Sequence, residues 1–170
     1  LGHMEPGRGM AEILEDMTLL AQETRMAYPR APLIMLGHSM GSFLARAFIV
    51  DHPGLVDGLI LSGTAFRSQL PIRAGRSLAR RIGATRGLTY RSELVEKLAL
   101  GAYSTPFRPN RTPHDWISRN EAAVDEYEAD ELSGSMFTVG AYSEMFGLLG
   151  RVCSTSHLNA TPRDLPILII

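Results

Sequence analysis

The sequence is poor in cysteine, and it has no apolar run long enough to cross a membrane. Because Cys153 is the only cysteine, the chain cannot form an internal disulfide, and it fits a reducing compartment. A spanning helix needs about 20 consecutive apolar residues, and no run approaches that length. We therefore expect a cytoplasmic protein. The given sequence does not begin with a secretory signal peptide. Because we expect the natural N-terminus to be missing, a signal peptide is not excluded.

Net charge is also small. The chain carries a net charge of −1, so bulk electrostatics give no reason to expect a nucleic acid partner. Apolar residues make up 45% of the sequence and charged residues 21%, which is ordinary for a globular protein. A chain of 170 residues is long enough for one domain with a hydrophobic core.

The most informative stretch is Gly-His-Ser-Met-Gly at residues 37–41. It follows the apolar run 33–36 and leads directly into a helical pattern over 40–51. Together these segments predict a strand, a tight turn and a helix, with Ser39 at the apex. This arrangement exposes a nucleophilic serine, whose backbone is strained by the sharp reversal of the chain. The competing interpretation is a glycine-rich turn that carries a serine by chance.

The four neighbours of Ser39 have expected roles of their own. Gly37 and Gly41 would let the strand and the helix approach closely, because neither has a side chain. The helix that begins at Met40 would point the positive end of its dipole, and the Met40 backbone N–H, at the place where an oxyanion forms. His38 lies on the strand side of the turn, and we expect it to be structural and not the catalytic base.

These residues carry a resemblance to a known family. The motif at 37–41, followed by Leu-Ile-Leu-Ser-Gly-Thr-Ala at 59–65, resembles the α/β-hydrolase fold. The closer likeness is to serine aminopeptidase S33-type hydrolases, which include monoacylglycerol lipases and lysophospholipases. Residues 110–112 and 115–119 resemble the cap region of bacterial lysophospholipase-like members. The likeness runs over nearly the whole chain but matches only the middle of such an enzyme.

The expected fold class is α/β, with a parallel sheet that is incomplete in this chain and a helical cap inserted between strands. Residues 1–65 would form the hydrolase core, 66–164 the cap or lid, and 165–170 a returning core strand. Short continuous apolar runs predict parallel strands that are buried on both faces. The expected strands are 33–36, 57–62 and 165–170, and the expected helices are 10–28, 40–51, 71–82, 92–100, 113–129 and 138–150.

The resemblance implies a serine hydrolase that cleaves acyl esters, such as monoacylglycerols or lysophospholipids, through an acyl-enzyme and without cofactor or metal. It places the triad acid just after Ile170, the histidine further on, and the second oxyanion donor before residue 1. The chain alone is therefore expected to be inactive. His52 lies about 18 Å along the helix from Ser39, at 1.5 Å per residue, so it is a poor substitute base. His114 and His157 are poor substitutes because they fall in the cap.

Other functions stay open. Aminopeptidase or amidase activity uses the same serine chemistry, and a non-catalytic protein could use the fold to bind a hydrophobic ligand or a partner. Cys153 and His157 lack a third ligand, so they make a poor metal site. The cap's aromatic residues are expected mostly in its core, with one or two lining an acyl pocket. The sequence does not fix the oligomeric state.

Charge is divided within residues 66–164. Seven arginines occur without an acid among them: Arg67, Arg73, Arg76, Arg80, Arg81, Arg86 and Arg91. An acidic stretch over 115–131 follows, interrupted only by Arg119. The plainer interpretation is that these halves face each other or water. The functional one is an arginine surface for a phosphate head group, with Arg76 and Arg80 binding substrate, or for transient contact with an anionic membrane surface.

Overall fold

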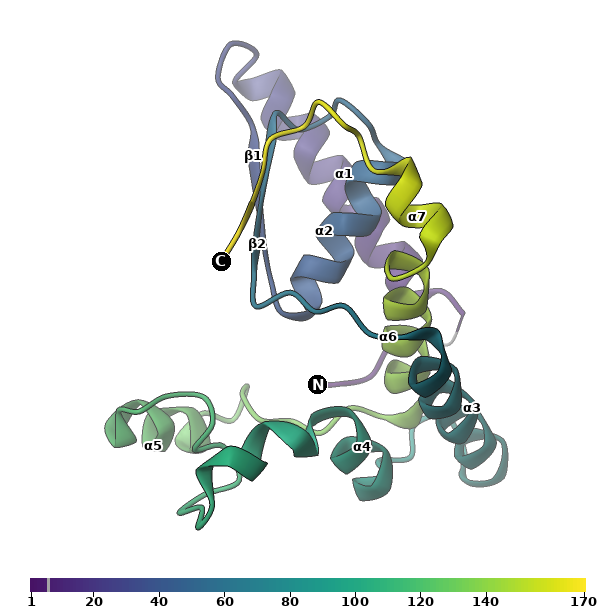
Figure 1. The fold of residues 1–170 in the computed structure, drawn as a ribbon, viewed down its shortest axis with the longest axis vertical. Coiled ribbons are helices and arrows are strands. Elements are labelled where there is room, and N and C mark those ends of the chain that lie inside the picture. Colours follow the sequence, from purple (N-terminus) through teal and green to yellow (C-terminus); the bar gives the residue numbers. More distant parts are fainter. Residues whose placement is uncertain (6) are drawn as a thin grey trace.

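The segment around Ser39 lies in a parallel sheet in the computed structural model, which describes residues 1–5 and 7–170 (Figure 1). The strands are β1 (Ile34–His38), β2 (Gly58–Ser62) and β3 (Ile167–Ile169). The helices are α1 (Gly9–Ala27), α2 (Met40–Asp51), α3 (Gln69–Arg86), α4 (Glu93–Ser104), the 3-10 turn η1 (Thr105–Phe107), α5 (Glu121–Ala129), α6 (Val139–Val152) and α7 (Thr155–Ala160). All three expected strands are present, with ends that differ by at most two residues.

The sheet has the strand order β1-β2-β3, and both pairs of neighbours are parallel. Its register places Leu36 opposite Ile60 and Ile60 opposite Leu168. Helix α2 connects β1 to β2, and the long helical segment α3–α7 connects β2 to β3. Because parallel strands run the same way, the carboxyl ends of all three strands meet at one edge, next to Ser39.

The expectation that these strands are buried on both faces is wrong for the described residues. Helices α1 and α2 lie on one face of the sheet (Figure 1). On the other face of β1, Ile34 is 50% exposed and Leu36 is 63% exposed. Every residue of β3 is exposed as well. The apolar runs identify the strands, but an apolar run does not reveal which faces are covered.

Two groups of buried side chains hold the helices in place. Phe48 and Ile49 of α2 pack with Leu59 and Leu61 of β2, which fixes α2 on the sheet. Other α2 side chains, including Leu44, pack with residues of α3, α4 and α6. Helix α2 therefore belongs to both groups, and it links the sheet to the inserted helical segment.

The expected helix over 113–129 begins only at Glu121. Before it, the Asp115 carboxylate accepts hydrogen bonds from the backbone N–H groups of Arg111 and Thr112 and from the Thr112 hydroxyl, 2.7 Å away. These bonds stabilise a turn in competition with the helix. The side chain of Asn120 then accepts from the Ala122 N–H at 3.1 Å and starts α5. Helix α7 and the turn η1 were not expected from the pattern.

The two charged halves of the inserted segment do not pair with each other among the described residues. The arginine-rich helix α3 packs against α6, and the acidic helix α5 lies at the other end of a lower layer that includes α4 (Figure 1). Both halves face water instead. None of the described helices combines the length and the apolar composition that a membrane-spanning segment needs.

Candidate active site

Ser39 has the strained backbone that the motif predicts. Its φ is 50° and its ψ is −118°, and within residues 1–5 and 7–170 it is the one non-glycine residue with positive φ. Such a conformation is unfavourable for a residue with a Cβ and persists only where neighbours hold it. The Ser39 N–H donates to the Ser62 carbonyl at 2.9 Å, which ties the turn to the end of β2.

Ser42 holds the other side of the turn. Its side chain is completely buried, and its hydroxyl donates to the Ser39 carbonyl at 2.6 Å. The Ser42 N–H donates to the same carbonyl at 2.9 Å. The backbone of Ser39 is therefore fixed at both its N–H and its C=O, while its side chain stays exposed at the start of α2.

Met40 and His38 lie on either side of the serine. Met40 is the first residue of α2, so its N–H has no acceptor within the helix and points out of the helix N-terminus. The His38 Nδ1 lies 3.0 Å from the Ser62 hydroxyl. That bond links the ends of β1 and β2 beside Ser39, and the structural role of His38 stays a prediction.

Gly37 and Gly41 have different environments. A Cβ at Gly37 would lie 2.5 Å from the Gly41 carbonyl oxygen and 2.9 Å from the Cβ of Ala45, so β1 and α2 do approach closely there. A Cβ at Gly41 would meet nothing within 4 Å. Close packing therefore excludes a side chain at Gly37, as expected, but not at Gly41. The Gly41 carbonyl faces β1, whereas the position that a Gly41 side chain would take faces open space.

Arg46 of α2 binds two points that are far apart in the sequence. Its guanidinium donates to the Ala65 carbonyl at 3.0 Å and to the Val152 carbonyl at 2.7 Å. The Arg46 carbonyl in turn lies 3.1 Å from the Nε2 of His157 in α7. One side chain from the helix that follows Ser39 thus contacts the chain where the insertion leaves β2 and where α6 ends.

None of the five histidines bonds to Ser39. His38 contacts Ser62, and the other four contact different elements. Those pairs are His3 with Thr138, His52 with Thr18, His114 with Glu128, and His157 with the Arg46 carbonyl. The structure therefore brings Ser39, Met40 and His38 together at one edge of the sheet and does not add a base from residues 1–5 or 7–170.

The two arginines expected to bind substrate lie on α3, away from this edge. The Arg76 guanidinium carbon comes within 3.1 Å of where a Cβ on Gly147 of α6 would lie. Arg80 is exposed one turn further along α3. No hydrogen bond or ion pair joins either arginine to residues 37–41 in the described part of the chain. Their role in binding substrate remains a prediction.

Two pockets formed by the described residues lie away from this edge. One of about 340 Å³ lies near the amino ends of the strands and is lined in part by His52, Asp57 and Pro166. A second, of about 520 Å³, lies between α1 and the end of α2. Neither includes Ser39. Among the described residues, no group of three or more histidine, cysteine or acidic side chains is arranged to hold a metal ion.

Comparison with known proteins identifies the family. The model of the family described as serine aminopeptidase, S33, matches residues 2–170. The chain belongs to this family. A monoacylglycerol lipase of Mycolicibacterium smegmatis is 27% identical over 125 residues, which make up 74% of this chain and 39% of that protein. The chain thus spans about two fifths of the length of this curated relative.

Solved structures agree on the fold. A thermostable carboxyl esterase from Bacillus coagulans, solved with glycerol, superimposes with a TM-score of 0.79 at 23% identity. The match covers 91% of this chain and 50% of that one. A lipase in an open form gives the same TM-score at 18% identity, over 99% of this chain and 60% of that one. The expected partial α/β-hydrolase fold is therefore confirmed.

The supporting residues Ser42, Ser62 and Arg46 were not predicted from the sequence. A signal for Ser42 exists, because a serine three residues after Ser39 at a helix start can reach back to its carbonyl. Arg46 is the single charged side chain among residues 40–50, and a lone arginine in an apolar helix needs a buried partner. The Ser62 contact could not be found, since it depends on the register of β1 and β2.

Proposed function

We propose that this chain carries the nucleophile of a serine hydrolase that cleaves acyl esters such as monoacylglycerols or lysophospholipids. The observation that carries the proposal is the backbone of Ser39, which is held in a strained turn at the carboxyl edge of the sheet and at the start of α2. The family and the monoacylglycerol lipase relative support an ester of this kind.

The chemistry follows from this geometry. The Ser39 Oγ attacks the ester carbonyl and forms a bond to its carbon, while the serine proton passes to a base. The carbonyl oxygen gains negative charge, and the Met40 N–H and the positive end of α2 stabilise it. Loss of the alcohol gives the acyl-enzyme, and water then releases the acid. All five histidines have other partners, so the proposal takes the triad acid and histidine from outside residues 1–170.

Residues 66–164 would act as a lid over Ser39, between a core of 1–65 and the returning strand at 165–170. Figure 1 supports this for α4 and α5, which lie beyond the end of the sheet where α2 begins and β3 ends, whereas α7 lies beside the opposite end of α2. The stacked rings of Tyr103 and Trp116, 5.0 Å apart, belong to this layer. A lid of this kind would shield the acyl chain from water. With Cys153 as the single cysteine, we propose a cytoplasmic location.

The test uses the protein expressed from its complete reading frame. Ser39→Ala should abolish hydrolysis of a p-nitrophenyl ester, a loss of several powers of ten, and should block labelling by a fluorophosphonate. Ser62→Ala is the matched control, because it removes a neighbouring hydroxyl at the same edge of the sheet. It should keep the labelling.

Three results would change the proposal. Normal labelling of the Ser39→Ala variant would show that Ser39 is not the nucleophile. No labelling of the natural protein would favour a non-catalytic protein that binds a hydrophobic ligand or a partner. Faster cleavage of an amide than of the matching ester would favour an aminopeptidase or amidase.

A further inference from the structure

Helix α3 has an outer face that is exposed and rich in arginine. Its buried residues, Ile72, Gly75, Ala79 and Gly83, turn toward the rest of the protein. The opposite face follows the same helical spacing, and all of its residues are exposed. We call it the outer face of α3, and it consists of Leu70, Arg73, Ser77, Arg80, Arg81 and Ala84.

The positive charge on this face is not neutralised by the protein. Helix α3 contains no aspartate or glutamate. Among residues 1–5 and 7–170, none of the ion pairs involves Arg73, Arg80 or Arg81. Four acidic residues of the insertion, Glu121, Asp125, Glu126 and Glu128, lie instead on α5, at the far end of the lower layer (Figure 1). The outer face therefore keeps a net charge that attracts anions.

The spacing of the arginines argues for an extended anionic surface and against one bound phosphate. Arg73 and Arg81 are eight residues apart, which is about 12 Å along a helix, so they cannot converge on a single phosphate group. Each guanidinium can instead bind a separate phosphate through its planar pair of N–H donors. A lipid surface offers many such groups in one plane.

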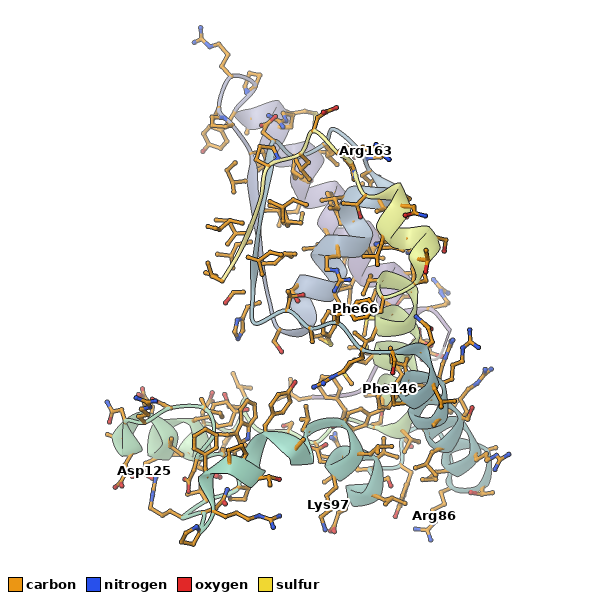
Figure 2. All side chains as sticks on the ribbon, in the orientation of Figure 1. Phe66, Arg86, Lys97, Asp125, Phe146 and Arg163 are labelled. Carbon is orange, nitrogen blue, oxygen red and sulfur yellow. The ribbon has the colours of Figure 1, made fainter. Side chains whose placement is uncertain are left out.

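An apolar side chain accompanies this charge at the start of α3. Leu70 is 79% exposed on the outer face, and Phe66, just before the helix, is 63% exposed. Figure 2 shows Phe66 near the end of α3 that is closer to the sheet and Arg86 at the opposite end. An exposed leucine beside arginines is typical of helices that lie in the interface of an anionic bilayer.

We propose that the outer face of α3 docks on an anionic phospholipid surface, with its arginines on the lipid phosphates and with Leu70 inserted among the head groups. This contact does not depend on the chemistry of Ser39. A Ser39→Ala variant should therefore bind membranes as the natural protein does.

The test measures co-sedimentation of the protein with two kinds of vesicle, phosphatidylcholine alone and phosphatidylcholine mixed with phosphatidylglycerol. Binding is expected only to the mixed vesicles, and it should weaken as salt screens the charges. Replacing Arg73, Arg80 and Arg81 together with glutamine should lower the partition coefficient about tenfold to a hundredfold. The matched control replaces Arg30, Arg119 and Arg163, which are exposed outside α3, and should bind nearly as well as the natural protein.

The outcomes separate the alternatives. Equal loss in both triple variants would mean that only net charge matters and would overturn the docking face. Equal binding to both kinds of vesicle, or to neither, would also overturn it. Release from the mixed vesicles by inorganic phosphate, but not by chloride at the same ionic strength, would assign the arginines to a soluble phosphate ligand. Circular dichroism and thermal unfolding check that both triple variants stay folded, as expected for exposed side chains.

Discussion

Gly37 and Gly41 occupy equivalent places on either side of Ser39, but the structure gives them different tasks. Alanine at Gly37 would place its Cβ 2.5 Å from the backbone oxygen of Gly41, and backbone cannot move aside cheaply. We expect Gly37→Ala to lower the free energy of unfolding by about 3 kcal/mol or more, which is the upper range for overpacking. Gly41→Ala meets open space inside a helix and should raise it by up to about 1 kcal/mol.

Urea unfolding of the two variants measures this difference, and each glycine is the control for the other. Similar destabilisation by Gly37→Ala and Gly41→Ala would contradict the prediction, because it would show that β1 and α2 pack closely at both glycines. The sequence motif alone cannot predict this difference between Gly37 and Gly41. It gives the positions of the two glycines, but not the direction in which a side chain at each position would point.

At the scale of single elements, α7 is joined to α2 by a histidine that is buried and neutral. Burial lowers the pKa of His157. The bond to the Arg46 carbonyl opposes this, the charges of Arg151 and Arg46 lower the pKa further, and Asp51 raises it. The unfolded chain, with a histidine pKa of about 6.5, therefore binds a proton more readily than the folded chain.

The sign of the pH effect follows. Stability from neutral His157 is fully present above about pH 6.5 and is lost as the pH falls below that value toward the lowered pKa of the folded state. We expect the free energy of unfolding, measured with urea, to fall less between pH 7.5 and pH 5 in the His157→Gln variant than in the natural protein. The glutamine side-chain amide can still donate to the Arg46 carbonyl. An equal fall in the free energy of unfolding in the variant and in the natural protein would assign the pH dependence to other groups.

The elements also show what could be predicted from sequence. Helix α2 has the expected bounds, because apolar spacing begins after Ser39 and His-Pro-Gly at 52–54 ends it. Helix α5 starts eight residues later than expected, because the Asp115 carboxylate accepts hydrogen bonds from Thr112 and stabilises a turn there. Residues 113–120 have a helical pattern of apolar positions, but periodicity does not reveal a side chain that competes for backbone N–H groups.

For the whole molecule, the fold class could be predicted and the covered surfaces could not. Apolar runs separated by a helix predict parallel strands wherever they occur. Which strand face is covered depends on long-range packing, as the exposed β3 shows. In the candidate site, too, some residues could be predicted from the local sequence and others could not. Ser39 and Met40 follow from local order, whereas Arg46 acts through carbonyls 19 and 106 residues away.

The open sheet face leads to a prediction about association. Leu36, Ile60 and Leu168 lie opposite one another across the three strands, and Leu36 and Leu168 are 63% and 54% exposed. An apolar row of this kind on a sheet favours contact between molecules. The 170-residue chain should therefore associate increasingly with concentration, as measured by sedimentation velocity.

Replacing Leu36 and Leu168 with glutamate should reduce this association, because two carboxylates would flank Ile60 and repel a second sheet. The control replaces Leu19 and Leu132, which are 58% and 75% exposed outside the sheet, so that the change in net charge is the same. A chain that stays monomeric at every concentration, or equal effects of the two double variants, would contradict the prediction. An effect of Leu36 and Leu168 alone would place the contact on the uncovered face of the sheet, since charge is matched and only position differs.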